Sequence, residues 1–211
     1  MADTRRISIT EALTELKLYD QKINKALSSA YFVGGKKKSS NIVSIFKLEN
    51  FEANAKASYQ SVSDLIENRA KLKSAIVQSN ATTMVEIAGK KYTVAEAIER
   101  KNSIMYDKML LQTMKSQWSE ANIKVEKENN RVDTQVDKML ETFLGKDSEK
   151  KVSEADLNAI SEPYRVKNEW ELVDPLNLYA NIQAMDADID AFEADVDVRL
   201  SISNSVTYIE V

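Results

Sequence analysis

Apolar residues recur three or four positions apart near the start of the chain, the spacing of one face of an α-helix. Ser8 and Glu11 have the spacing of a capping box, so the first helix is predicted to begin after Ser8. It is expected to end before Gly34-Gly35. The apolar positions of this heptad-like seam are Ile9, Leu13, Leu16, Ile23 and Leu27.

A second apolar stripe, over about residues 51–78, predicts a return helix, so residues 8–78 are expected to form a helical arm. The stretch between the two helices, residues 41–51, could be a short strand or the entry to the second helix. Asp20 and Arg69 interrupt the two seams, and a charge there can fix the register between helices. They could pair with each other, or line a ligand pocket between subunits.

Residues 83–93 predict a β-hairpin, because β-branched residues flank a turn that contains Gly89. Thr93 and Glu96 then form a second capping box, which opens a long helix over residues 94–144. About 50 helical residues extend roughly 75 Å, deeper than the core of a domain this size. A rod-like hairpin, a kink or a partner subunit is therefore expected to cover the apolar stripe.

An insertion follows over residues 145–173. A short helix is expected there, capped by Ser153 and ended by Pro163, with an extended segment after it. Asp174 and Pro175 are then expected to cap and open the last helix. After Leu200 the pattern alternates, which predicts a terminal strand, so residues 175–211 should form a helix and a strand. The strand is expected to pair with the 83–93 hairpin.

The predicted fold is mainly α: long antiparallel coiled-coil-like helices with a small β-hairpin and a C-terminal strand, in a single elongated helical domain over residues 1–211. Only four glycines and two prolines occur in 211 residues, too few for the turns of a sandwich or barrel.

The chain contains no histidine and no cysteine, which excludes Cys/His zinc sites, thiol nucleophiles, disulfides and a Ser-His-Asp triad. Carboxylates and Ser/Lys pairs do not have the spacing of a specific active site. We therefore predict a protein that is not an enzyme, with no catalytic residues, no cofactor and no metal. The sequence has no apolar run of about 20 residues and no secretion signal at its start, which predicts a cytoplasmic protein that does not enter membranes.

The net charge of −4 is unevenly distributed. Residues 1–50 hold nine Lys/Arg against five Asp/Glu, and residues 151–211 hold four against thirteen. This asymmetry indicates either a partner of opposite charge or two ends of the chain that lie near each other, and we favour the second. The acidic overall balance disfavours nucleic-acid binding.

The strongest anion-binding candidate is the loop that holds Lys36, Lys37 and Lys38 after two glycines. Its spacing is not that of a Walker motif, and lysine runs are more often solvated loops. Arg69 and the rings of Tyr19 and Tyr59 are further candidates for a ligand-binding pocket, although tyrosines at helix interfaces are more often half-buried packing residues.

Two other groups of residues are more often structural. Asp186, Asp190, Glu193 and Asp197 share one helix face and could hold a divalent cation, but a solvated face is the usual explanation. Met105, Met109 and Met114 could form an adaptable groove, yet methionines at such spacing are usually core residues.

Three segments carry a family resemblance. They are Ile9-Thr10-Glu11-Ala12-Leu13, residues 80–100 from Asn80 through Gly89 to Arg100, and Leu200-Ser201-Ile202-Ser203-Asn204. In this order they resemble the DIP1984-like (septicolysin) helical family and related small proteins of bacteria and phages, over about half the chain. The resemblance implies a long helical hairpin with a small β element, assembled into homo-oligomers, and implies no catalytic residues.

Together these features suggest three functions. The first is an oligomeric binding protein that captures a small anionic, nucleotide-like ligand; if the protein is phage-encoded, that ligand would be a host immune signal. The second is a structural virion or scaffold component. The third is an inhibitor that docks its acidic C-terminal helix on a host protein.

Overall fold

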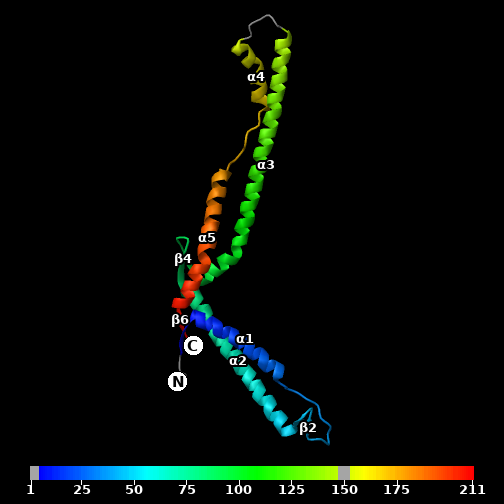
Figure 1. Ribbon diagram of the computed structural model, residues 1–211, viewed down its shortest axis with the longest axis vertical. Coiled ribbons are helices and arrows are strands. Elements are labelled where there is room, and N and C mark those ends of the chain that lie inside the picture. The colour runs from blue at the N-terminus through cyan, green and yellow to red at the C-terminus, as the bar shows by residue number, and fades with distance from the viewer. Residues whose placement is uncertain (1–4, 147–152) are drawn as a thin grey trace. The chain divides into compact units, whose positions relative to one another are not determined.

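The computed structural model describes residues 5–146 and 153–211, and it confirms the mainly α fold with small two-stranded antiparallel sheets (Figure 1). The described helices are α1 (Ile9–Ser29), α2 (Leu48–Thr82), α3 (Val94–Lys146), α4 (Glu154–Asn168) and α5 (Leu178–Val206). The described strands are β1 (Arg6–Ser8), β2 (Ile42–Val43), β3 (Phe46–Lys47), β4 (Met84–Ile87), β5 (Lys90–Thr93) and β6 (Tyr208–Glu210).

The predicted capping box starts α1. The Glu11 amide donates to the Ser8 hydroxyl at 3.2 Å, and the Ser8 amide donates to the Glu11 carboxylate at 2.8 Å. The helix ends at Ser29, where Ala30 adopts an extended conformation, so the glycines do not cap it. Residues 41–51 contain both of the structures left open by the sequence, the β2–β3 hairpin and then the first turn of α2.

The predicted hairpin and long helix are also present. β4 and β5 pair antiparallel across a turn in which Ala88 and Gly89 both have positive φ, 49° and 74°. Two such residues in sequence are typical of the tight turn that suits the twist of a hairpin. The Thr93 amide then donates to the Glu96 carboxylate at 2.7 Å, the second predicted capping box, and α3 follows with 53 residues.

Pro163 does not end α4, which continues through it to Asn168, so the prediction of an extended segment from residue 164 is wrong at its start. A proline removes one helical hydrogen bond, but Pro163 is exposed and contacts beyond it hold the following turn. The Arg165 guanidinium lies 2.6 Å from the Asp133 carboxylate on α3 and 3.0 Å from that of Glu169.

The start of α5 is also later than predicted. Pro175 lies in a turn, Asn177 has a positive φ of 50°, and the helix begins at Leu178. Asp174 still caps the helix from a distance, because its carboxylate accepts a 2.7 Å hydrogen bond from the Leu178 amide. The intervening turn is what separates the capping residue from the first helical turn.

The pairing predicted for the C-terminal strand is wrong. α5 remains helical to Val206, and β6 pairs antiparallel with β1, not with the β4–β5 hairpin. Ile7 lies opposite Ile209, and the pairing continues through two hydrogen bonds of 2.8 and 3.0 Å between the backbones of Arg5 and Val211. This pairing buries both isoleucines against α1 and α2.

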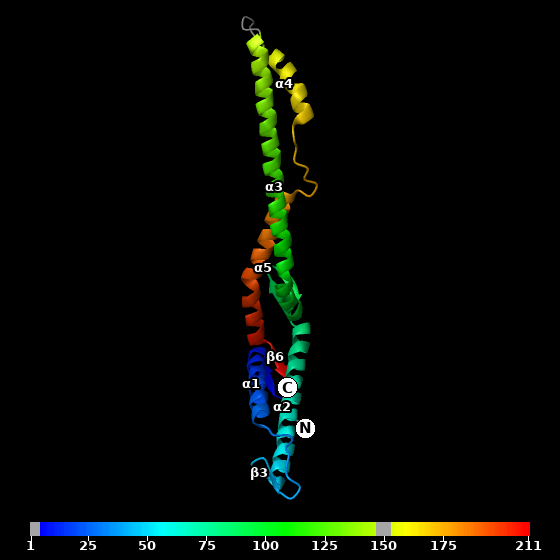
Figure 2. The ribbon, with the colours of Figure 1, turned by 90° about the vertical axis from the view of Figure 1, so that its right-hand side faces the viewer.

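The chain forms two compact units. Unit 1 comprises the residues up to Asn102 together with Ala191–Val211, and unit 2 comprises Ser103–Asp190. In unit 1, α1 lies beside α2 (Figures 1 and 2). The core cluster of unit 1 consists of Ile7, Ile9, Ala12, Leu72, Ile76 and Ile209. The single elongated domain stays a prediction.

In unit 2, α3 lies beside the first part of α5 and beside α4 (Figures 1 and 2). The Lys115 ammonium is 2.8 Å from the Asp186 carboxylate, and the rings of Trp118 and Tyr179 are 5.5 Å apart. No helix within residues 5–146 and 153–211 is apolar over a length that would cross a bilayer.

Candidate ligand-binding groove

A groove of about 470 Å³ lies in unit 1, where α1, α2 and the β1–β6 sheet meet. Its volume is within the range of small-molecule sites, roughly 300–1,000 Å³. The lining residues come from three separate parts of the chain: Arg5, Glu15, Tyr19, Asn68, Lys71, Leu72, Ala75, Glu210 and Val211. The groove therefore exists only when the arm and the C-terminal strand are both in place.

The floor of the groove is apolar. Leu72 belongs to the core cluster and is 3% exposed, and Ala75 and Tyr19 pack against the same cluster. Tyr19 is half-buried: it packs against the core cluster and also lines the groove. An aromatic ring held in this way can stack on a flat ligand group at little cost in side-chain entropy.

Two cations lie along the groove, and each is paired with a carboxylate. Arg5 bonds to Glu15, which also lines the groove, and the Lys71 ammonium lies 2.7 Å from the Glu67 carboxylate. The hydrogen bond and charge of Lys71 hold the pKa of Glu67 below its ordinary value. All four side chains are partly exposed, and ion pairs of this kind contribute about 0–1 kcal/mol. A more highly charged anion can therefore displace the carboxylates.

Arg69 and Asp20, which interrupt the two seams, pair with each other. The guanidinium Nε lies 2.5 Å from the carboxylate, and this bond raises the pKa of Arg69. The pair is adjacent in sequence to Tyr19 and Asn68, which line the groove. Lys22 adds a further positive charge, with its ammonium 5.9 Å from the Tyr19 ring centroid.

The structure places the lysine loop elsewhere, between α1 and β2 at the far end of the arm (Figure 1). Lys36, Lys37 and Lys38 are exposed, and the Lys36 ammonium donates to the Ser40 carbonyl at 3.0 Å. Gly34 is needed there for close packing, because a Cβ would lie 2.6 Å from Val43 Cγ1. The hollow nearest this loop in sequence, lined by Tyr31, Phe46 and Phe51 among others, is only about 230 Å³.

Tyr59 is 67% exposed on α2 and does not line the groove. The predicted ligand-binding residues therefore separate into two groups. Tyr19 lines the groove, with Arg69 next to it in sequence, and the three lysines and Tyr59 lie outside it.

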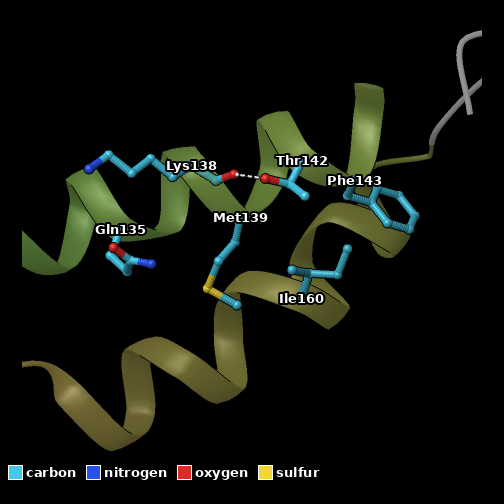
Figure 3. Close-up of a pocket in the computed structure, with 6 residues that line it drawn as sticks. All are labelled: Gln135, Lys138, Met139, Thr142, Phe143 and Ile160. Carbon is cyan, nitrogen blue, oxygen red and sulfur yellow. Dashed lines mark hydrogen bonds between the residues drawn. The ribbon is translucent and has the colours of Figure 1, made fainter. Parts of the chain in front are cut away.

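A second hollow, of about 400 Å³, lies in unit 2 between α3 and α4 (Figure 3). Met139 points from α3 toward α4 and Ile160, whereas the ammonium of Lys138 points away from the hollow. The Thr142 hydroxyl donates to the Lys138 carbonyl of its own helix at 2.7 Å. With its hydroxyl occupied and its cation turned away, this hollow is an open helix–helix contact more than a specific polar site.

The acidic stretch of α5 contacts partners within the chain. Asp186 bonds to Lys115, Asp197 lies 2.5 Å from Lys101, and Asp195 accepts from the Ala88 amide at 3.1 Å. The last bond, with help from Arg199, lowers the pKa of Asp195. Within the described part of the chain, no group of three or more acidic side chains is arranged to hold a metal ion. The basic N-terminal and acidic C-terminal ends do meet at β1 and β6, but the acids of α5 pair with α3.

The sequence did not predict that Arg5, Asn68 and Lys71 line one groove, because no local pattern connects these three residues. A signal for Arg5 was present in the alternation of Arg6-Ile7-Ser8-Ile9, a short period-two pattern that marks β1. Recognising that strand would have offered a partner for the C-terminal strand, and so placed Arg5 beside α1 and α2.

Comparison with known protein families, with curated proteins and with solved structures found no match for this chain. The resemblance to the DIP1984-like family and to phage proteins therefore stays a prediction.

Proposed function

We propose that this protein is a non-enzymatic, oligomeric binding protein that captures a small anionic, nucleotide-like ligand in the groove between α1, α2 and the β1–β6 sheet. The observation that carries the proposal is the combination of a half-buried ring, Tyr19, with two displaceable cations, Arg5 and Lys71, in one groove of ligand size. A flat base can stack on the ring, and a phosphate can bind the cations.

The remaining polar groups favour a nucleotide over inorganic phosphate. Glu15 and Glu210 also line the groove, and their carboxylates repel a bare anion but accept hydrogen bonds from ribose hydroxyls or base amino groups. The Asn68 amide can both donate and accept. A ligand with an anionic end and a hydrogen-bond-donating end fits this mixed lining best.

Capture without reaction is the expected outcome of binding. In a phage, a protein of this kind would sequester a nucleotide immune signal in the host cytoplasm, in proportion to the number of grooves. The proposal that an acidic C-terminal helix docks on a host protein is weaker, because Asp186, Asp195 and Asp197 are already paired within the chain.

The test is calorimetry of the purified protein against mononucleotides, cyclic nucleotides and cyclic dinucleotides at physiological salt. We expect saturable heat with one of these classes and recovery of the ligand unchanged after denaturation. Lys71→Glu should weaken binding at least tenfold, whereas Lys73→Glu should not. Lys73 is exposed on the same helix and does not line the groove.

Tyr19→Leu keeps an apolar side chain against the core cluster and removes the stacking ring, so it should weaken binding without unfolding the arm. Circular dichroism of each variant checks that the helices are intact. Absence of heat with every nucleotide, together with no retained mass in native mass spectrometry of protein taken from expressing cells, would refute capture. Recovery of a chemically altered ligand would refute the non-enzymatic part.

A further inference from the structure

Helix α3 is apolar on two opposite sides within unit 2. On one side Ile104 and Leu111 are buried, 5% and 6% exposed, on the side of the helix that holds Lys115 and Trp118 against α5. On the other side lie Met105, Tyr106, Met109 and Leu110, which we call the Met–Tyr face, and which are 50–67% exposed. At 3.6 residues per turn these four span an arc of about 140°, centred roughly opposite the buried side.

The Met–Tyr face lacks charge. The next exposed residues along the same arc are Thr113, Ser116 and Gln117, whereas Asp107 and Lys108 project from other sides of the helix. Such a neutral stretch is unusual in a chain in which 29% of residues are charged. Met105 and Met109 are both exposed, so the interpretation of these two methionines as core residues of this chain is wrong. A helix that is apolar on both sides is normally covered on both.

We propose that the Met–Tyr face is a self-association surface, covered by the same face of a second copy of this chain in an antiparallel, two-fold pair. A neutral surface gains nothing from an acidic or basic partner, but it can meet its own copy without repulsion. Methionine side chains adapt readily to such a contact.

The area is sufficient for a small specific interface. Four large side chains of about 200 Å² each, roughly half exposed, supply on the order of 400 Å² per copy. Thr113, Ser116 and Gln117 extend this area, so the pair approaches the roughly 1,200 Å² total at the low end of stable interfaces. A smaller patch would not hold two copies together.

The direction of the pair follows from the charges beyond the face. Glu120, Lys124, Lys127 and Arg131 continue the same arc toward the end of α3. A parallel pair would place each of these charges against its own copy, which is repulsive. An antiparallel pair centred near Met109 places the two copies of Lys127 roughly 50 Å apart. The proposal does not depend on ligand capture.

The chain contains no cysteine, so a single introduced cysteine reports the pairing directly. Met109→Cys should give a covalent dimer with a short bis-maleimide, because the two thiols lie near the two-fold axis. Glu141→Cys, at an exposed site on the same helix, should give no covalent dimer after the same treatment, because its two copies lie roughly 90 Å apart. Equal cross-linking of both variants, or cross-linking of neither, overturns the antiparallel pair.

Light scattering gives an independent test that uses the wild-type chain. Wild-type protein should have twice the mass of one chain, and a Tyr106→Glu/Met109→Glu double variant should have the mass of one. The control Asn130→Glu, at an exposed polar site on α3, should leave the dimer intact. Circular dichroism establishes that the variants remain helical. A monomeric wild-type protein at all concentrations overturns the proposal.

Discussion

The α1–α2 arm of unit 1 and the α3–α4 pair of unit 2 both place two helices side by side, but different forces hold them. The arm encloses an apolar cluster to which α1, α2 and both strands of the β1–β6 sheet contribute. Helix α4 contributes no buried residue, and its contact with α3 includes the exposed ion pair of Arg165 with Asp133. Apolar burial stabilises a contact more than exposed ion pairs do. The arm should therefore unfold at a higher denaturant concentration than the one that separates α4 from α3.

The two regions can be observed separately. Both tryptophans of the chain, Trp118 and Trp170, lie in unit 2, so tryptophan fluorescence reports that unit alone. Far-ultraviolet circular dichroism reports the helices of both units. Variants in either unit should therefore change one signal more than the other.

The largest expected effect is on the apolar cluster. Ile76→Ala should lower the free energy of unfolding by about 2–5 kcal/mol, because Ile76 is 2% exposed and its truncation leaves a cavity. Ile160→Ala, the same change on the half-buried face of α4, should cost less than about 1 kcal/mol. Urea titrations followed by circular dichroism measure both, and equal losses would contradict the comparison.

The next effect concerns the segment after α4. The Asn129 amide donates to the Trp170 carbonyl at 2.9 Å and accepts from the Trp170 amide at 2.7 Å. Asn129→Ala removes both bonds and should cost about 1–3 kcal/mol locally. We expect faster hydrogen exchange at the Trp170 amide and a red-shifted fluorescence, with unit 1 unchanged. The neighbouring Asn130→Ala serves as the control. A similar fluorescence shift in that variant would argue against the two hydrogen bonds between Asn129 and Trp170 as the cause.

A smaller effect compares the same Ser→Ala change at two capping boxes, one closed by Glu11 and the other by Asp156. Ser8→Ala should destabilise unit 1 by about 1 kcal/mol, because the hydroxyl caps a helix that packs on the core. Ser153→Ala removes the same capping box from α4. Since α4 has no buried residue, its first turn should fray without a measurable change in the global transition. Equal changes in the two transitions would show that α4 is coupled to the rest of unit 2 more tightly than its contacts indicate.

The smallest effect is a pH dependence. Backbone and side-chain hydrogen bonds to the cap residues lower the pKa of Glu11 and Glu96 in unit 1 and of Asp156 in α4. A lowered carboxyl pKa stabilises the folded state above the ordinary pKa, and this stabilisation is lost as the pH falls toward the folded value.

The ordinary values are 4.5 for Glu and 3.8 for Asp, so on acidification the stabilisation from the Glu caps of unit 1 should begin to fall at a higher pH than that from Asp156. Urea titrations at a series of pH values, followed by circular dichroism, measure where each loss begins. Glu11→Gln should remove part of the acid-induced change in unit 1, and loss of the Asp156 cap at the higher pH would reverse the expected order.

Local signals explain most of what the sequence predicted. Capping boxes at Ser8, Thr93 and Ser153 fixed three helix starts, because each depends on residues three positions apart. The prediction that Pro163 ends α4 was wrong, because it considered only the local effect of a proline on a helix. The contact that holds the following turn, Arg165 to Asp133, joins residues 32 positions apart in the sequence.

The strand pairing and the groove depend on contacts between residues that are distant in the sequence. The pairing of β6 with β1 depends on which apolar partner Ile209 finds in the folded chain, and short strands carry little information about that partner. Tyr19 and Arg69 could be singled out as a ring and a charge on apolar seams. Arg5 and Lys71 look like ordinary surface residues until β1 and α2 place them at the same groove.

The β1–β6 pair also sets the order of events during synthesis. Ile209 leaves the ribosome about 200 residues after Ile7, which at about 5–20 residues per second is a delay of roughly 10–40 s. During that interval α1 and α2 can form, but their shared cluster lacks Ile209. Unit 1 is therefore complete only after residues 208–210 have been synthesised.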